Sequence, residues 1–143
     1  MSKATTAADV RNVCVCLNLQ RAARAVARRY DRALQGVGLT SGQFSILAGL
    51  LRDDAIALGD LSAALGLDRT TLNRNLRPLE DEGLVESVAD SQDQRVRALR
   101  LTARGRARMD LALPKWRAAQ NESDELIGKA AWPAFKRTLN SLA

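Results

Sequence analysis

A run of polar side chains with the chemistry to read a nucleic acid lies on one predicted helix near the middle of the chain. Leu72, Leu76 and Leu79 recur at helical spacing, so one side of this helix is apolar. The rest of its surface carries guanidinium, hydroxyl and amide groups, on Arg69, Thr70, Thr71, Asn73, Arg74 and Arg77. The helix therefore has one face to bury and another that can form hydrogen bonds with a partner.

These polar side chains suit the major groove of double-stranded DNA. There arginine can bond guanine, asparagine can bond adenine, and threonine can donate, accept or touch a thymine methyl group. We expect base contacts from Thr70, Asn73 and Arg74. Arg69 and Arg77 are expected to bind phosphates, which position a protein without reading the sequence. The alternative for the whole set is a solvated polar helix face.

The elements that position this face can be read from the same stretch. A short helix over residues 58–65 ends at Gly66, and Asp68 is a good N-cap for the reading helix. Alternating apolar residues then predict a β-hairpin with strands at 84–89 and 96–101. Helix, turn, helix and hairpin together predict a winged helix-turn-helix in a mainly α protein.

The tip of the predicted hairpin, residues 90–95, is charged and forms the wing. Arg95, held by Asp93, suits insertion into a narrow and electronegative minor groove. The alternative is a flexible arginine on a hairpin. Arg97 and Arg100 flank the strand and are expected to contact the DNA backbone.

This stretch resembles the MarR family of bacterial transcription regulators. The match includes the run LGLDRTTLNRNLRPLEDEGLV and the wing. In the wing, the family pattern D-x-R-D-x-R followed by L-x-L-T falls on Asp90, Asp93, Arg95, Leu99, Leu101 and Thr102. Gln92 departs from the pattern, which has an arginine there. The resemblance implies a two-fold repressor that covers a promoter, and it supports the placing of Arg95 as the wing arginine.

Helices at the two ends of the chain predict a homodimer. Residues 1–8 are expected to fray, and a helix over residues 9–34 is too long to be buried by one winged helix. We therefore assign residues 39–102 to the DNA-binding region, and residues 1–38 and 103–143 to a helical dimerisation bundle like that of the family. Such a dimer would place its reading helices about 34 Å apart on an inverted-repeat DNA site.

Two cysteines and a tyrosine on the first helix are candidates for sensing an oxidant. Cys14 and Cys16 would lie about 200° apart on a continuous helix, so they cannot readily join each other. Cys16 shares a face with Tyr30 about 21 Å away, so only an antiparallel partner helix brings the two together. The residues resemble those of the organic-hydroperoxide-responsive branch, where partner tyrosines hold an oxidised cysteine; Gln20 stands in place of the second tyrosine. The alternative is two small side chains in a dimer core.

A small aromatic effector is the other candidate signal. It would bind between the dimer helices and the winged region, against side chains such as Tyr30, Phe44, Trp116 and Trp132. Core packing is the alternative use of these aromatic residues.

Composition limits the other function classes. The 143 residues carry a net charge of +6 with a pI of about 10.1, mostly from arginine, which suits contacts to phosphate and guanine. There is no histidine, the commonest general base and metal ligand, and the acidic run at residues 80–82 is expected to be solvated. We therefore predict a protein that is not an enzyme and needs neither cofactor nor metal. Without an apolar run that could span a membrane, a cytoplasmic location is expected.

These observations predict a sequence-specific DNA-binding regulator, a repressor released by a small molecule or an oxidant. One alternative is a thiol-based organic peroxide sensor of the same family. Another is a winged-helix module that dimerises and binds protein without reading DNA. A thiol-dependent peroxidase acting through Cys16 is a third.

Overall fold

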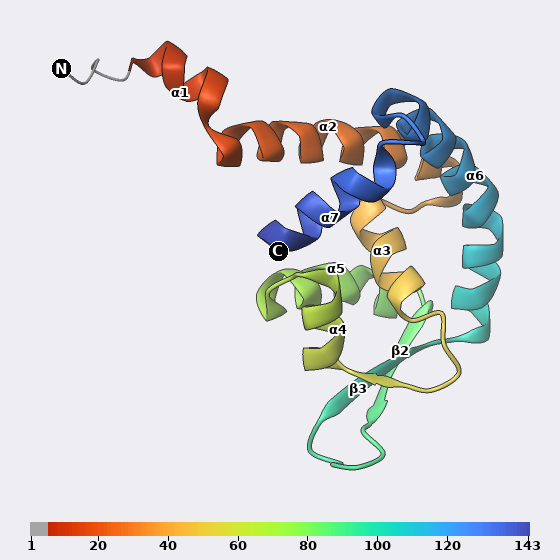
Figure 1. The fold of residues 1–143 in the computed structure, drawn as a ribbon. Helices are drawn as coiled ribbons and strands as arrows, with labels where there is room; N and C mark the ends of the chain where they lie inside the picture. Colours follow the sequence, from red (N-terminus) through yellow and green to blue (C-terminus); the bar gives the residue numbers. More distant parts are fainter. Residues whose placement is uncertain (1–5) are drawn as a thin grey trace.

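The computed structural model describes residues 6–143 and confirms a mainly α protein with a winged helix-turn-helix. Figure 1 shows α2 crossing the top of the molecule, with α1 extending beyond its left end. Helix α6 lies on the right side and connects the hairpin at the bottom with the top of the molecule. In chain order the elements are α1 (Ala7–Val13), α2 (Val15–Leu34), η1 (Gln35–Val37), α3 (Ser41–Gly49), β1 (Ile56–Ala57), α4 (Leu58–Leu65), α5 (Arg69–Asp81), β2 (Val85–Ala89), β3 (Arg97–Leu101), α6 (Ala103–Ile127) and α7 (Trp132–Leu142).

Local capping groups set the boundaries of the winged helix-turn-helix. Thr40 and Gln43 form a capping box at the start of α3, with hydrogen bonds of 3.1 and 3.0 Å. Gly66 ends α4 at φ 63°, a left-handed conformation that costs glycine little. Asp68 then caps α5 by accepting the backbone N–H of Thr71 at 2.8 Å. The turn between α4 and α5 is therefore encoded locally.

The wing belongs to a three-stranded antiparallel sheet of order β1-β3-β2. Val85 pairs with Leu101 at one end of the hairpin, and Ala89 pairs with Arg97 at the other. The short strand β1 adds to the free edge of β3 through Ile56, opposite Leu99. This register fixes the direction in which the wing leaves the helices.

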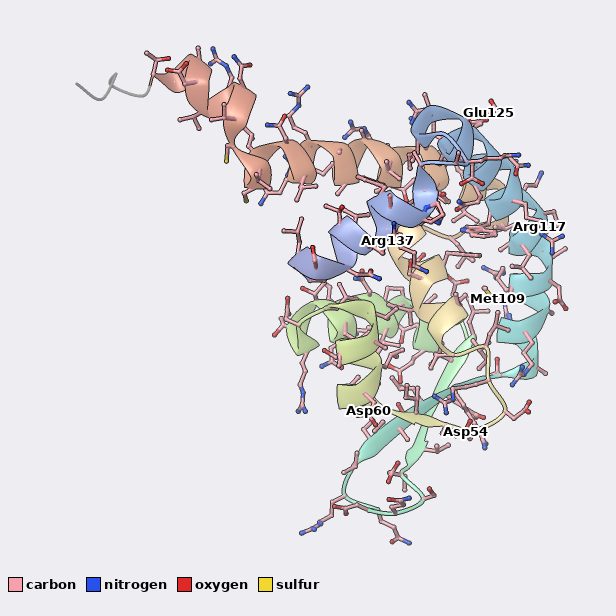
Figure 2. All side chains as sticks on the ribbon, in the orientation of Figure 1. Asp54, Asp60, Met109, Arg117, Glu125 and Arg137 are labelled. Atoms are coloured by element: carbon pink, nitrogen blue, oxygen red, sulfur yellow. The ribbon has the colours of Figure 1, made fainter. Side chains whose placement is uncertain are left out.

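The apolar stripe of α5 is the centre of the core. Leu72, Leu76 and Leu79 have no exposed surface and pack in one cluster with residues of α3 and the sheet. Full burial of each leucine contributes about 2 kcal/mol. Met109 of α6 is equally buried and points inward from that helix (Figure 2). The stripe therefore fixes the rotation of α5 and determines which side chains it exposes.

The prediction of one continuous helix over residues 9–34 is wrong. A capping box of Thr6 and Asp9 starts α1 at Ala7, and the chain breaks at Cys14, whose φ of −69° and ψ of 109° are not helical. Asn18 stabilises the break, because its amide donates to the carbonyls of Arg11 and Cys14 at 3.1 and 2.9 Å. The surrounding β-branched and cysteine residues are also weak helix formers. Part of the predicted frayed segment, residues 1–5, lies outside the described residues.

Residues 103–143 form two helices, in line with the predicted helical region. Thr102 caps α6, which continues through Pro114 to Ile127, and α7 starts with Pro133 in its first turn. Helix α6 packs along α2 and contacts α3, so an N-terminal and a C-terminal helix lie side by side. Among residues 6–143, no helix has the length and apolar character needed to cross a membrane.

Candidate nucleic-acid interface

Helix α5 presents the predicted reading face to solvent. Arg69, Thr70, Asn73, Arg74 and Arg77 are all exposed on it, opposite the buried leucine stripe. The helix also continues for three residues after Pro78. Proline lacks a backbone N–H, but at this position near the end of α5 only one backbone hydrogen bond is lost. The exposed face therefore extends over the whole of α5.

Thr71 differs from the other predicted residues. It is half-buried, and its hydroxyl donates to the Asp68 carboxylate at 2.8 Å in addition to the backbone bond that caps α5. The backbone and side-chain hydrogen bonds from Thr71 hold the pKa of Asp68 below its ordinary range. Thr71 thus orders the first turn of the reading helix.

The wing tip holds Arg95 in an extended position. The Asp90 carboxylate accepts the backbone N–H groups of Gln92 and Asp93 at 3.0 and 3.1 Å, which closes the turn. Asp93 in turn accepts the Arg95 backbone N–H at 3.0 Å and its guanidinium at 3.2 and 3.3 Å. The side-chain hydrogen bond from Arg95 is the main reason that the pKa of Asp93 is lowered. The Arg95 side chain remains 90% exposed, which leaves it available to a partner.

Arg97 lies at the base of the wing, where β3 meets α5. Its guanidinium donates to the Asn73 side-chain oxygen at 2.8 Å, to the Ser87 hydroxyl at 2.8 Å and to the Glu80 carboxylate. Its predicted contact with DNA stays a prediction, but the structure adds a role within the protein. Arg97 joins the reading helix to both strands of the hairpin.

Glu80 is part of this network, so the prediction of a solvated acid at this position is wrong. Burial alone would raise the pKa of Glu80, but the hydrogen bonds from Arg97 and Ser87 outweigh it and lower the pKa. The sequence did contain a signal for Glu80, because it lies seven residues after Asn73 and therefore on the same face of the helix. Ser87 of β2 was also not predicted to take part in the site, and helical spacing gives no signal for it.

The predicted redox residues lie apart from this surface. Cys16 is exposed on α2, while the Tyr30 hydroxyl donates to the Gln120 side chain of α6 at 2.8 Å. Cys14 lies at the break between α1 and α2, where its sulfur accepts the Leu17 N–H at 3.4 Å. The helical geometry used to separate the two cysteines therefore does not hold, because Cys14 is outside the helix.

An open apolar hollow of about 1180 Å³ lies between the helical arm, formed by α1, α2 and α7, and the winged unit, which extends from α3 to β3. It lies between α2, α3, α6 and α7, and the four aromatic residues expected at an effector site, Tyr30, Phe44, Trp116 and Trp132, all line it. The rings of Phe44 and Trp116 stack with centroids 6.0 Å apart and an interplanar angle of 14°. Arg29 is the one cationic residue among its described lining residues.

Comparison with known proteins identifies the family. The sequence signature of the MarR family matches residues 39–96. A structure of the M. tuberculosis transcriptional regulator MosR in complex with DNA has a TM-score of 0.81 and 40% sequence identity, over 90% of this chain and 92% of that one. The chain belongs to the MarR family. The matched residues include α5, β2 and the wing tip.

Other transcription regulators are similar along most of the chain. The transcriptional repressor CouR bound to a 23-mer DNA duplex is 25% identical, covers 99% of both chains and has a TM-score of 0.81. The regulator TtmR of Methylorubrum extorquens is 32% identical over 92 residues, which are 64% of this chain and 47% of TtmR. This chain spans about half the length of TtmR and of two other curated relatives, with coverage of 44% to 55%.

Proposed function

We propose that this protein is a sequence-specific DNA-binding transcription regulator that acts as a homodimer. The observation that carries the proposal is the exposed polar face of α5 beside a wing whose arginine extends into solvent. Thr70, Asn73 and Arg74 would contact base edges in the major groove, and Arg69 and Arg77 would bind phosphates. Arg95 would enter the adjacent minor groove.

Exposed apolar side chains on the helical arm support dimerisation. They lie on α1, α2 and α7 and comprise Val10, Val13, Val15, Leu19, Val26, Phe135 and Leu142. Surfaces of this kind rarely face water in a stable monomer. A second copy of the chain would cover them and bring two α5 helices to the two halves of an inverted repeat.

The inner part of the apolar hollow supports control by a small molecule. The stacked Phe44 and Trp116 rings, with Arg29 on the same lining, suit an aromatic acid. CouR of Rhodococcus jostii, 25% identical to this chain, has been solved with p-coumaroyl-CoA bound. A ligand held between α2 and α3 would change the distance between the two reading helices and release the DNA, which is the behaviour of a repressor.

A thiol signal is the second candidate for release. Cys14 and Cys16 lie beside the break between α1 and α2, where a local change would alter the arm without unfolding the winged unit. Treatment of the DNA complex with an organic hydroperoxide tests it. Release of the wild type but not of Cys16→Ser supports the thiol, whereas release of neither favours the small-molecule route.

The rival function is a winged-helix module that binds protein and not DNA. Selection of duplexes from a random library distinguishes the two, with the wild type compared with an Arg74→Ala/Arg95→Ala variant. If the protein is a DNA-reading regulator, the wild type enriches one class of sequence. The variant then loses this enrichment, while light scattering shows that it remains dimeric. A wild type that enriches no sequence would overturn the proposed function.

A further inference from the structure

The side-chain amide of Asn73 has a direction that is fixed by its neighbour. Arg97 donates from Nη1 to the Asn73 Oδ1 at 2.8 Å, across 24 residues of sequence. A guanidinium carries only donors, so the atom of the amide that faces it must be the oxygen. The NH₂ group of Asn73 therefore points the other way, on the exposed side of α5.

Arg97 is held in this position by its other contacts. The same guanidinium donates to Ser87 at 2.8 Å and pairs with Glu80, so three protein groups share it. Its side chain is 37% exposed, and that of Glu80 is 27% exposed, so the pair is partly shielded from water. A second carboxylate is not needed, because this arrangement already engages every branch of the guanidinium: Nε with Ser87, Nη1 with Asn73 and Nη2 with Glu80.

We propose that Arg97 acts as a positioning residue that makes Asn73 a donor-only reader of bases. This inference rests on the proposed DNA-binding function. An asparagine with both groups free pairs with adenine, accepting from N6 and donating to N7. The Asn73 oxygen is turned toward Arg97 and its NH₂ group lies on the exposed side, so toward a base Asn73 presents a donor and prefers edges that only accept. In the major groove these are the N7 and O6 of guanine and the O4 of thymine.

The preference at the base pair read by Asn73 follows from this chemistry. Guanine and thymine are favoured there, adenine loses the bond that its N6 would have donated, and cytosine offers its N4 donor where Asn73 presents another donor. We expect guanine to exceed adenine by about tenfold in affinity at this position. This contradicts the simple expectation from residue type, by which asparagine selects adenine.

The test starts from the duplex that the wild type enriches from a random library. Asn73→Ala identifies the base pair, because the variant loses discrimination at the position that Asn73 reads and at no other. Four duplexes that differ only at this pair are then titrated against each variant by fluorescence anisotropy. Asn73→Asp keeps an oxygen toward Arg97 but replaces the outward NH₂ with an acceptor, so the preference should move from guanine toward adenine and cytosine.

Arg97→Met frees the Asn73 oxygen and should raise the affinity for adenine relative to guanine by about tenfold. Arg100→Met is the matched control. It removes the same charge from the same strand, but Arg100 pairs with Glu86 at 2.6 Å and has no bond to Asn73. A purely structural role of Arg97 would weaken all four duplexes equally, so the change of base preference is the informative readout. If Arg97→Met does not fold, the Asn73→Asp series decides alone.

The outcomes separate this inference from the function on which it rests. Enrichment of a sequence with guanine or thymine at the Asn73 position, together with a shift toward adenine in Arg97→Met, supports the proposal. Adenine at that position in the wild type, no position relaxed by Asn73→Ala, or the same base preference in Arg97→Met and Arg100→Met would overturn it while leaving DNA binding intact. Failure of the wild type to enrich any sequence removes both.

Discussion

Arg95 and Arg97 lie two residues apart but differ in exposure and in their bonds to the protein. Arg95 is held only by the neighbouring Asp93 and keeps 90% of its side chain exposed, whereas Arg97 is bound by three groups of the protein. An exposed ion pair contributes little to folding, so the Asp93 contact serves mainly to orient Arg95. At the residue scale, the proposed contact with DNA and the support of α5 are thus divided between Arg95 in the wing turn and Arg97 at the start of β3.

Arg95→Ala should therefore weaken DNA binding by about tenfold at physiological salt and leave stability within about 0.5 kcal/mol. Fluorescence anisotropy and urea unfolding measure the two effects. Arg117→Ala is the control, because it removes the same charge from the outer side of α6, away from the wing (Figure 2). Equal losses of affinity in the two variants would show that only net charge matters.

The Glu80 network predicts a pH dependence of stability. The folded pKa of Glu80 lies below its ordinary value, so its contribution is present above about pH 4.5 and is lost as the pH falls through the lower, folded value. Glu80→Gln lacks this contribution. Its free energy of unfolding should be lower than that of the wild type at pH 7, and the difference should shrink as the pH falls below about 4.5.

Urea unfolding at several pH values tests this prediction, with Glu122→Gln as the control for removal of an exposed carboxylate from α6. Parallel curves for wild type and Glu80→Gln over the acid range would contradict the proposed contribution of the ion pair.

At the scale of elements, a close contact between Gly105 and Leu84 fixes α6 to the start of the hairpin. A Cβ built at Gly105, in the first turn of α6, would overlap the backbone carbonyl of Leu84, which also accepts the Thr102 N–H at 3.1 Å. The neighbouring atom is backbone and cannot turn aside, so only glycine allows the helix to start where it does. This contact sets the angle between α6 and the hairpin.

Gly105→Ala should reduce the free energy of unfolding by about 3 kcal/mol. Gly36→Ala should change it by no more than about 0.5 kcal/mol, because nothing lies within 4 Å of a Cβ there. Both values can be measured by urea unfolding at neutral pH. A Gly105→Ala protein as stable as Gly36→Ala would show that α6 can shift from the wing without cost.

The elements that the sequence predicted well are those with local signals. Gly66 and Asp68 mark helix ends by their own conformation or side chain, and both predicted boundaries agree with the structure. The break at Cys14 was missed because it depends on how Asn18 bonds to carbonyls up to seven residues away.

Long-range contacts explain what was missed in the site. The polar face of α5 follows from the spacing of three leucines, so its residues could be named in advance. The partners of Arg97 could not, because Asn73 lies 24 residues away and meets it only once the hairpin has folded onto α5. Periodicity gives the face of a helix, but it does not give the element that packs beside it.

At the scale of the whole molecule, we expect the apolar surface of the helical arm to determine how the polar faces of two α5 helices are spaced. The exposed apolar residues of α2 and α7 lie on the helical arm, while the winged unit carries the side chains proposed to bind DNA. Figure 1 shows α2 and α7 above α4, α5 and the hairpin. A two-fold partner on the arm would fix the spacing of the two winged units. Dimer formation and specific DNA binding should therefore be lost together.

Phe135→Asp tests this coupling. Phe135 is 41% exposed on α7 and is one of the apolar residues that a second copy would cover, so its replacement by a charge would act twice in a two-fold interface. We expect dimerisation to weaken by about 100-fold, measured by light scattering over a concentration series. Leu111→Asp is the matched control, because Leu111 is 64% exposed but lies on α6, outside the proposed dimer surface.

The most direct test of the account is a titration of the wild-type dimer, by fluorescence anisotropy, with an enriched duplex and with a scrambled duplex of the same composition. The account predicts that the enriched duplex binds about 1,000-fold more tightly, and that the affinity for both falls steeply as salt is raised. Equal and weak binding of the two duplexes at every salt concentration would contradict the assignment of α5 and the wing as a sequence-reading surface.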